Sequence, residues 1–324
     1  MRDGLGRSLR DLRISVTDRC NFRCRYCMPV EIFGPNYQFL ERSEILSFEE
    51  IVRVVQAGVE LGVRKVRLTG GEPLLRRGVE DLVGLLAAVE GVEDLALTTN
   101  GVLLAHHAEG LALAGLNRVT VSLDALDGEV FGKMNGVGAK VERVLAGVAA
   151  AQVHGLPVKV NVVVQRGVNE SEILPMVKWG REWGVTVRFI EYMDVGETNG
   201  WKMDDVVSGK EIVERVGEEF AVERVMPSYA GEVAQRWKFA DGGEFGVITS
   251  VTEPFCGGCT RARVSAEGRV FTCLFAGEGT DLRETLREGG SQEELVEVLG
   301  GIWGGRRDRY SEERGEVEKV KAEM

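Results

Sequence analysis

The chain has 324 residues, 44% hydrophobic and 28% charged, which is the composition of an ordinary globular protein of one or two domains. Its 51 acidic and 40 basic residues give a net charge of −11, which argues against broad nucleic-acid binding. No apolar run is long enough to span a bilayer, and the polar, basic first ten residues do not resemble a secretory signal. We therefore expect a cytoplasmic protein whose cysteines stay reduced.

The first two thirds of the chain predict six strand–helix units in succession. The expected strands are residues 13–17, 65–69, 95–99, 119–123, 158–164 and 185–190. Helical patterns are expected at residues 47–61, 79–89, 105–114, 141–154 and 170–183, the first opened by a capping box from Ser47 to Glu50. This alternation is typical of an α/β fold with right-handed parallel crossovers.

The expected strands alternate polar and apolar residues, whereas buried parallel strands usually read as continuous apolar runs. The polar positions are Arg13, Ser15, Thr17, Lys65, Arg67, Thr69, Thr120, Ser122, Asp124, Lys159 and Asn161. We expect the apolar face to lie under the helices and the polar face to line a cavity for a polar, anionic ligand. Alternatively, Arg67 and Lys159 lie at frayed strand ends in solvent.

Six units are too few for a closed eight-stranded barrel, so we predict an incomplete (β/α)6 TIM-type barrel. The last third adds a helix at 209–220, a hairpin at 236–243, a second hairpin at 263–273 and a helix at 293–303. We expect this α+β segment to close the open side. The predicted division is a partial barrel in residues 1–205 and a C-terminal region in residues 206–324, which carries a second cluster and binds substrate.

A first group of cysteines, Cys20, Cys24 and Cys27, follows the first expected strand with the spacing Cys-x3-Cys-x2-Cys. Thiolates are soft ligands that suit iron–sulfur clusters or zinc. Full ligation of a [4Fe–4S] cluster takes four cysteines, so three would leave one iron open for an external ligand. A structural zinc site is the alternative, but zinc motifs usually pair two Cys-x2-Cys units.

A second group, Cys256, Cys259 and Cys273, has the spacing Cys-x2-Cys-x13-Cys and again lacks a fourth cysteine. A zinc site completed by a histidine or a carboxylate is one interpretation, and a second cluster with an open iron is the favoured one. Arg261 and Arg263 lie two residues apart, so in a strand both guanidinium groups share one face. Arginine forks suit phosphate oxygens, which predicts a substrate phosphate near the second group.

Over residues 12–310 the chain resembles the GTP 3′,8-cyclase family of the radical S-adenosylmethionine (SAM) superfamily. The first cysteine spacing, with Tyr26 before its last cysteine, resembles the superfamily signature, and the second group followed by Arg-x-Arg resembles the family. The motifs that carry the resemblance are residues 18–29, 67–73, 188–196, 198–201 and 256–263, with Cys273.

The resemblance implies two [4Fe–4S] clusters, one on each group of cysteines. It implies that SAM is bound by Tyr26, Gly71, Ser122 and Met193. It implies that GTP is bound by Arg13, Arg67, Thr98, Lys159, Arg188, Arg261, Ala262 and Arg263, of which Arg261 and Arg263 are also the expected catalytic residues.

The activity implied is that of a lyase, which converts GTP to (8S)-3′,8-cyclo-7,8-dihydroguanosine 5′-triphosphate in the first step of molybdenum cofactor biosynthesis. The expected partners are an external electron donor and a downstream cyclic pyranopterin monophosphate synthase, without nucleic acid or membrane, and the protein is expected to be a monomer or homodimer. One alternative is a peptide-modifying radical SAM enzyme with an auxiliary cluster; another is a non-enzymatic electron carrier or regulator.

The family's C-terminal tail usually ends in Gly-Gly, whereas this sequence stops at Lys-Ala-Glu-Met in residues 321–324. From this difference we expect SAM cleavage that is poorly coupled to product.

Overall fold

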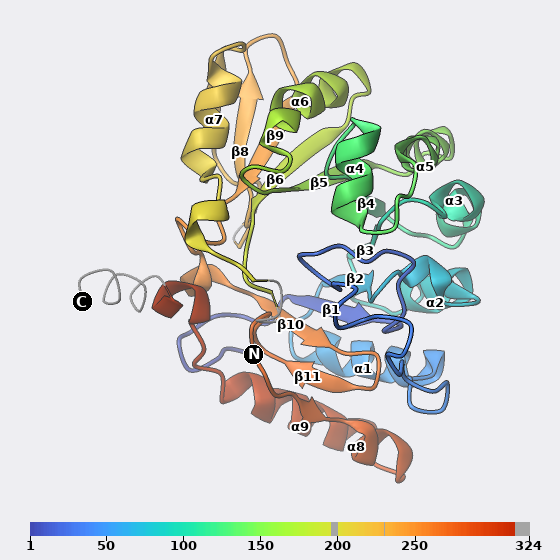
Figure 1. The fold of residues 1–324 in the computed structure, drawn as a ribbon. Helices are drawn as coiled ribbons and strands as arrows, with labels where there is room; N and C mark the ends of the chain where they lie inside the picture. Colours follow the sequence, from blue (N-terminus) through green and yellow to red (C-terminus); the bar gives the residue numbers. More distant parts are fainter. Residues whose placement is uncertain (196–199, 230, 315–324) are drawn as a thin grey trace.

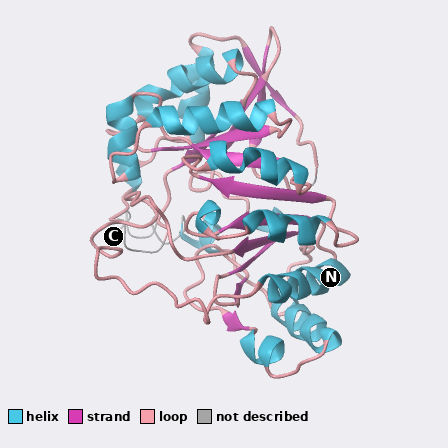
Figure 2. Ribbon diagram, turned by 90° about the vertical axis from the view of Figure 1, so that its right-hand side faces the viewer, coloured by secondary structure: helices cyan, strands magenta, loops and turns pink. Residues whose placement is uncertain are grey.

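The computed structural model describes residues 1–195, 200–229 and 231–314, so the C-terminal tail and its predicted role lie outside the described residues. The described residues form one sheet of twelve strands in the order β12-β11-β10-β1-β2-β3-β4-β5-β6-β9-β8-β7. Helices cover its outer face (Figures 1 and 2). The α/β class is therefore confirmed.

The six predicted strands are present and lie side by side in chain order, all parallel. They are β1 (Asp11–Ser15), β2 (Lys65–Thr69), β3 (Asp94–Thr99), β4 (Arg118–Ser122), β5 (Val158–Val164) and β6 (Thr186–Glu191). The helices of this part are α1 (Phe48–Glu60), α2 (Val79–Ala87), α3 (Leu104–Leu113), α4 (Gly128–Asn135), α5 (Val141–Val153) and α6 (Ile173–Glu182). The sequence did not predict α4.

The last third supplies strands to both edges of this sheet. Its elements are α7 (Gly209–Gly217), β7 (Val222–Val225), β8 (Gln235–Phe239), β9 (Glu244–Ile248), β10 (Arg261–Val264), β11 (Arg269–Phe271), β12 (Thr280–Asp281), α8 (Arg283–Arg287) and α9 (Gln292–Gly304). Both predicted hairpins form: β8 pairs with β9, and β10 with β11, each antiparallel. In addition, β10 lies parallel to β1 and β9 parallel to β6.

The incomplete six-stranded barrel is confirmed, and within the described chain the sheet stays open, ending at β12 and β7. The C-terminal segment extends both edges and also covers the inner face, where its residues line a cavity together with β1, β2, β3, β5 and β6. The division at residue 205 remains a prediction, since the second part shares the sheet of the first.

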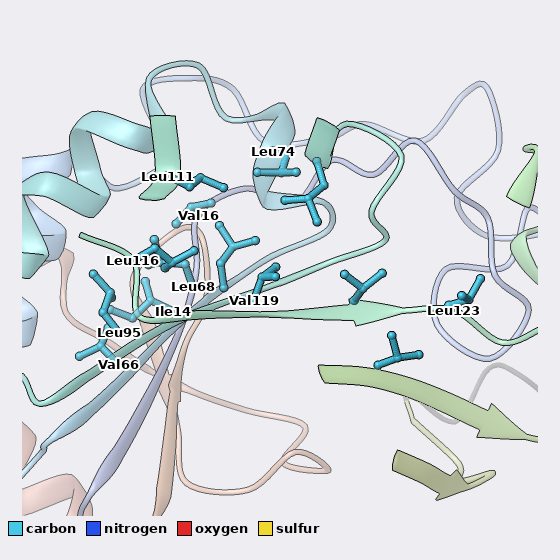
Figure 3. Close-up of a cluster of buried hydrophobic side chains, with 14 of the residues drawn as sticks. Ile14, Val16, Val66, Leu68, Leu74, Leu95, Leu111, Leu116, Val119 and Leu123 are labelled. Atoms are coloured by element: carbon cyan, nitrogen blue, oxygen red, sulfur yellow. The ribbon is translucent and has the colours of Figure 1, made fainter. Parts of the chain in front are cut away.

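The outer face of the sheet carries the hydrophobic core. Ile14, Leu68 and Val119 are fully buried there and pack beneath the helices, with Leu111 of α3 above them (Figure 3). Each such side chain stabilises the fold by about 1.5–3 kcal/mol relative to an exposed one. The predicted apolar face is thus the face that lies under the helices.

The inner face carries the polar residues that alternate with this core. Arg67 on β2 donates hydrogen bonds from Nη1 to the hydroxyls of Thr98 and Thr120, at 2.8 and 3.0 Å. Lys159 on β5 is half-buried and lines a cavity. Neither residue lies at a frayed strand end, so that alternative was wrong.

Among the described residues, no helix is both long and apolar enough to cross a membrane.

Candidate functional site

The largest concentration of the predicted site residues lines one cavity on the inner face of the sheet. The cavity has about 1180 Å³ of empty space, counting the part that is open to solvent. Its lining includes Arg13, Arg67, Thr98, Arg188, Met193, Cys256, Cys259, Arg261, Arg263 and Cys273. Residues that are far apart in the chain therefore meet at one site.

Arg13 lies at the centre of a row of arginines on three neighbouring strands. The sheet register places it beside Arg67 of β2 and Arg263 of β10. Among the described residues the side chain of Arg13 makes no hydrogen bond or ion pair. Burial lowers the pKa of Arg13 well below its usual range, and the neighbouring guanidinium groups lower it further.

Two other arginines of the cavity, Arg67 and Arg263, also have lowered pKa values. Burial and then Arg118 and Arg188 lower the pKa of Arg67 to about 10, and burial and then Arg261 lower that of Arg263 to about 10. Buried like charges of this kind destabilise the ligand-free fold. The arrangement is typical of a site that binds a multiply charged anion.

The basic lining continues to the other end of the strands. A second cavity shares Arg13, Arg67, Arg188 and Arg261 with the first. It adds the basic residues Lys159, Lys65 and Arg118 and the carboxylates of Asp11, Asp94 and Glu232, and Asp94 forms ion pairs with Lys65 and Arg118. Sequence reasoning placed Lys65 on the inner face without assigning it a ligand, and it did not single out Arg118. Tyr229 covers this end, with its ring centroid 3.3 Å from Lys65 Nζ.

The first thiol loop, residues 20–27, leaves the end of β1. Arg23 holds its shape, donating from Nη1 to the carbonyls of Cys20 and Phe22 at 2.8 and 2.7 Å. Burial, and then the nearby Cys20 and Asp124, raise the pKa of Cys27 to about 11. These crowded thiols therefore ionise readily only if a cation such as cluster iron offsets their charge.

Of the residues predicted to bind SAM, Tyr26 lies in this loop and Gly71 packs against Arg19, directly before it. The hydroxyl of Tyr26 donates to Asp124 Oδ2 at 2.6 Å. A Cβ at Gly71 would lie 2.2 Å from the carbonyl oxygen of Arg19, so this glycine is required by the loop itself. Ser122 is half-buried at the end of β4.

Glu72, which follows Gly71, ties the first loop region to the neighbouring strand ends, a role that sequence reasoning missed. Its buried carboxylate accepts from the Thr99 hydroxyl at 2.7 Å and from the backbone N–H of Asn100 at 2.7 Å. Burial raises the pKa of Glu72, and these donors oppose the rise. Only the Gly-Gly-Glu-Pro run in the sequence pointed to this residue.

The second thiol loop comprises residues 256–259 together with Cys273. The backbone N–H of Cys259 donates to the Cys256 carbonyl at 3.1 Å, and Arg261 Nη2 lies 3.3 Å from Cys259 Sγ. Burial raises the pKa of Cys259, but Arg261 and Arg306 outweigh it and lower the pKa to about 6. This thiol is therefore disposed to ligate iron as a thiolate.

Neither triplet of cysteines is arranged around a single point: among the described residues no group of three His, Cys, Asp or Glu could hold one metal ion. A zinc site gathers its ligands on one ion, whereas the thiolates of a [4Fe–4S] cluster each bind a different iron. All six cysteines are free thiols.

Ala262 is separated from the other predicted GTP ligands. Its side chain is buried in the core on the outer face of the sheet, between Arg261 and Arg263, which point to the cavity. Only its backbone can face a substrate.

The fold and the first thiol loop define a class of protein. The model of the Radical SAM superfamily matches residues 14–180. Streptococcus suis SuiB bound to S-adenosylmethionine has a similar fold, with a TM-score of 0.67 and 17% identity over 93% of this chain and 69% of that one. The chain is a member of the radical SAM superfamily.

The C-terminal part narrows the assignment. The Molybdenum Cofactor Synthesis C model matches residues 185–312. The GTP 3′,8-cyclase of Acidothermus cellulolyticus is 54% identical over 97% of this chain and 88% of its own length. That of Staphylococcus carnosus is 50% identical over 97% of this chain and 93% of its own. The chain belongs to the GTP 3′,8-cyclase family.

Proposed function

We propose that the chain binds GTP and SAM in the cavity of the sheet and joins C3′ of the ribose to C8 of guanine, forming (8S)-3′,8-cyclo-7,8-dihydroguanosine 5′-triphosphate for molybdenum cofactor biosynthesis. The observation that carries the proposal is that one cavity contains both the row of neighbouring arginines, Arg67, Arg13 and Arg263, and the second thiol loop. Family membership and the match to a molybdenum cofactor synthesis model support the same activity.

The proposed pose of GTP follows the charge of the cavity. Its triphosphate contacts Arg13, Arg67 and Arg188 and extends toward Lys159, Lys65 and Arg118, where basic side chains continue. Guanidinium forks bind phosphate oxygens in pairs, which suits a ligand with several phosphates.

The guanine end of GTP then lies toward the second thiol loop, beside Arg261 and Arg263, with Thr98 on the same inner face. This pose replaces the expectation, drawn from the sequence, that a phosphate lies beside Arg261 and Arg263. Arg261 and Arg263 act by holding the nucleotide, so that C3′ and C8 stay within reach of each other. The residues proposed to bind SAM are Tyr26, Gly71, Ser122 and Met193.

The two thiol loops are the proposed ligands of two [4Fe–4S] clusters, Cys20, Cys24 and Cys27 for one and Cys256, Cys259 and Cys273 for the other. When bound, the first cluster and SAM supply a 5′-deoxyadenosyl radical that takes a hydrogen atom from the ribose. The chain's own part is to orient the nucleotide and to exclude water around it. We also propose an external electron donor, a cytoplasmic location and a downstream cyclic pyranopterin monophosphate synthase; whether the protein acts as a monomer or homodimer stays a prediction.

No observation on this chain favours the alternative of a peptide-modifying enzyme. One solved SuiB structure is bound to a precursor peptide, but the 16% identity of that chain shows a shared fold and no shared substrate.

The test is an anaerobic incubation of the reconstituted protein with dithionite, SAM and either GTP, ATP or no nucleotide. We expect 5′-deoxyadenosine and a cyclised guanosine triphosphate with GTP, and little of either with ATP. Cleavage of SAM that does not depend on GTP, without any cyclised product, would contradict the proposal.

A further inference from the structure

Four charged residues from the two ends of the described chain form a buried ion network beneath the second thiol loop. They are Asp3, Arg7, Arg306 and Asp308. Arg7 Nε lies 2.5 Å from Asp3 Oδ2, Arg306 Nη2 lies 3.0 Å from Asp308 Oδ1, and Arg306 Nη1 lies 4.0 Å from Asp3 Oδ2. The side chains of Asp3, Arg7 and Arg306 are at most 2% exposed.

This ion network contacts the chain at or next to each of the three cysteines. Arg7 Nη1 donates to the Cys256 carbonyl at 3.1 Å. Arg306 Nη1 donates to the Cys259 carbonyl at 2.9 Å. The hydroxyl of Thr272, which directly precedes Cys273, donates to Asp308 Oδ2 at 2.6 Å.

Helix α9 and the first residues of the chain hold the network in place. Trp303 Nε1 donates to the Arg7 carbonyl at 3.2 Å, and the guanidinium of Arg306 lies 4.7 Å from the centre of the Trp303 ring. The backbone N–H of Gly4 donates to the Arg306 carbonyl at 3.3 Å. Segments that lie about 300 residues apart in the chain, such as Arg7 and Trp303, are therefore joined next to the second thiol loop.

Such a network is costly for stability alone. Buried ion pairs often contribute no more than well-packed apolar residues of the same volume, because each ion loses its hydration. Here two of the arginine donors end on the backbone carbonyls of two cysteines, so the network restrains the residues that carry the thiols. Hydrogen bonds to the residues that carry metal ligands orient those ligands.

We propose that Asp3, Arg7, Arg306 and Asp308, acting with Thr272, are positioning residues for the second cluster, and that the start of the chain is thereby part of the active-site structure. This inference rests on the proposed function only in taking Cys256, Cys259 and Cys273 as cluster ligands. Loss of a network contact lets the second thiol loop move, and the second cluster then dissociates faster. The first cluster is unaffected because, among the described residues, the contacts of the network are to residues 256, 259 and 272 and not to the first thiol loop.

The test uses Thr272→Val and Arg306→Met in the full chain, reconstituted anaerobically with both clusters. Iron release to a chelator is followed over time, and the electron paramagnetic resonance signal of each reduced cluster is recorded. We expect half of the iron to leave about 10- to 100-fold faster in both variants, with the first cluster's signal retained. Arg306→Lys keeps the charge but loses the fork, so we expect an intermediate rate.

Matched controls are Arg307→Met and Arg10→Met, which change exposed neighbours that do not contact the second thiol loop. Both should release iron at the rate of the unmodified chain. If Arg306→Met does not fold, Thr272→Val decides, since it removes one hydroxyl and keeps the side-chain shape.

Unchanged iron release and an unchanged second signal in Thr272→Val would overturn the proposal. Equal loss of iron from both clusters would also overturn it, because that result would indicate general destabilisation. The cyclisation assay on the unmodified chain is independent, so failure of the proposed function would appear there and not in these rates.

Discussion

Replacing Arg13 with methionine should raise the stability of the ligand-free protein and lower its affinity for GTP. Methionine fills a similar volume without the charge, so the row of guanidinium groups from Arg67 through Arg263 loses its central member. The side chain of Arg13 makes no ion pair or hydrogen bond among the described residues. The ligand-free protein therefore loses mainly repulsion from the neighbouring guanidinium groups, against a smaller attraction to Asp11. We expect the free energy of unfolding to rise by about 1–2 kcal/mol. This is the lower part of the range for replacing buried charged groups with apolar groups of similar volume.

Binding of GTP should weaken in the same variant. A charge-assisted contact contributes about 1.5–3 kcal/mol, which corresponds to an increase in Kd of about 10- to 150-fold. SAM affinity should change little, because Arg13 belongs to the part of the cavity assigned to GTP. Thermal unfolding without nucleotide measures the first effect, with a rise in Tm of about 2 °C or more. Calorimetric titration with GTP and with SAM measures the second.

The matched control is Arg10→Met, an exposed residue outside the cavity that should change neither quantity. A lower Tm in Arg13→Met would refute the reasoning about repulsion. An unchanged GTP affinity would refute the placement of the phosphates.

Three further predictions concern the thiol loops and the arginines beside them. Alanine at all three cysteines of the first thiol loop should leave about half of the iron and abolish SAM cleavage, and cleavage by this variant would refute the assignment. Arg261→Ala and Arg263→Ala should each weaken GTP binding by about 1.5–3 kcal/mol with SAM binding retained; equal loss of both ligands in titrations would indicate misfolding instead. Gly71→Ala should displace the Arg19 carbonyl at a cost of about 1–3 kcal/mol and lower iron in the first cluster alone, so iron analysis showing both clusters intact would contradict that role.

The inner face of the sheet was largely predictable because its signal is local. Alternation in each strand puts Arg13, Arg67 and Lys159 on one side, and the side-chain period of a strand is independent of tertiary contacts. The same rule placed Lys65 there. Its pairing with Tyr229 was not predictable, since a loop residue far along the chain carries no periodic signal.

Arg7 and Arg306 show why the rest could not be found from the sequence. Each is one of 40 Lys and Arg residues, and neither lies in a motif. Their burial follows from packing of α9 against the start of the chain, which depends on the whole fold. Likewise the parallel pairing of β10 with β1 joins residues about 250 positions apart, such as Arg261 and Asp11, and no local pattern encodes it.

That pairing has a consequence for how the chain matures during synthesis. Until residues 244–264 are synthesised, β1 and β6 are the two edge strands of a six-stranded parallel sheet, and each has a row of unpaired backbone groups. An unpaired edge strand can pair with a strand of another chain, and strand pairs between distant parts of a sequence form slowly. Nascent chains released after β6 are therefore the species most exposed to self-association. Addition of β9 and β10 pairs β6 and β1, and the sheet edges then lie at β7 and β12.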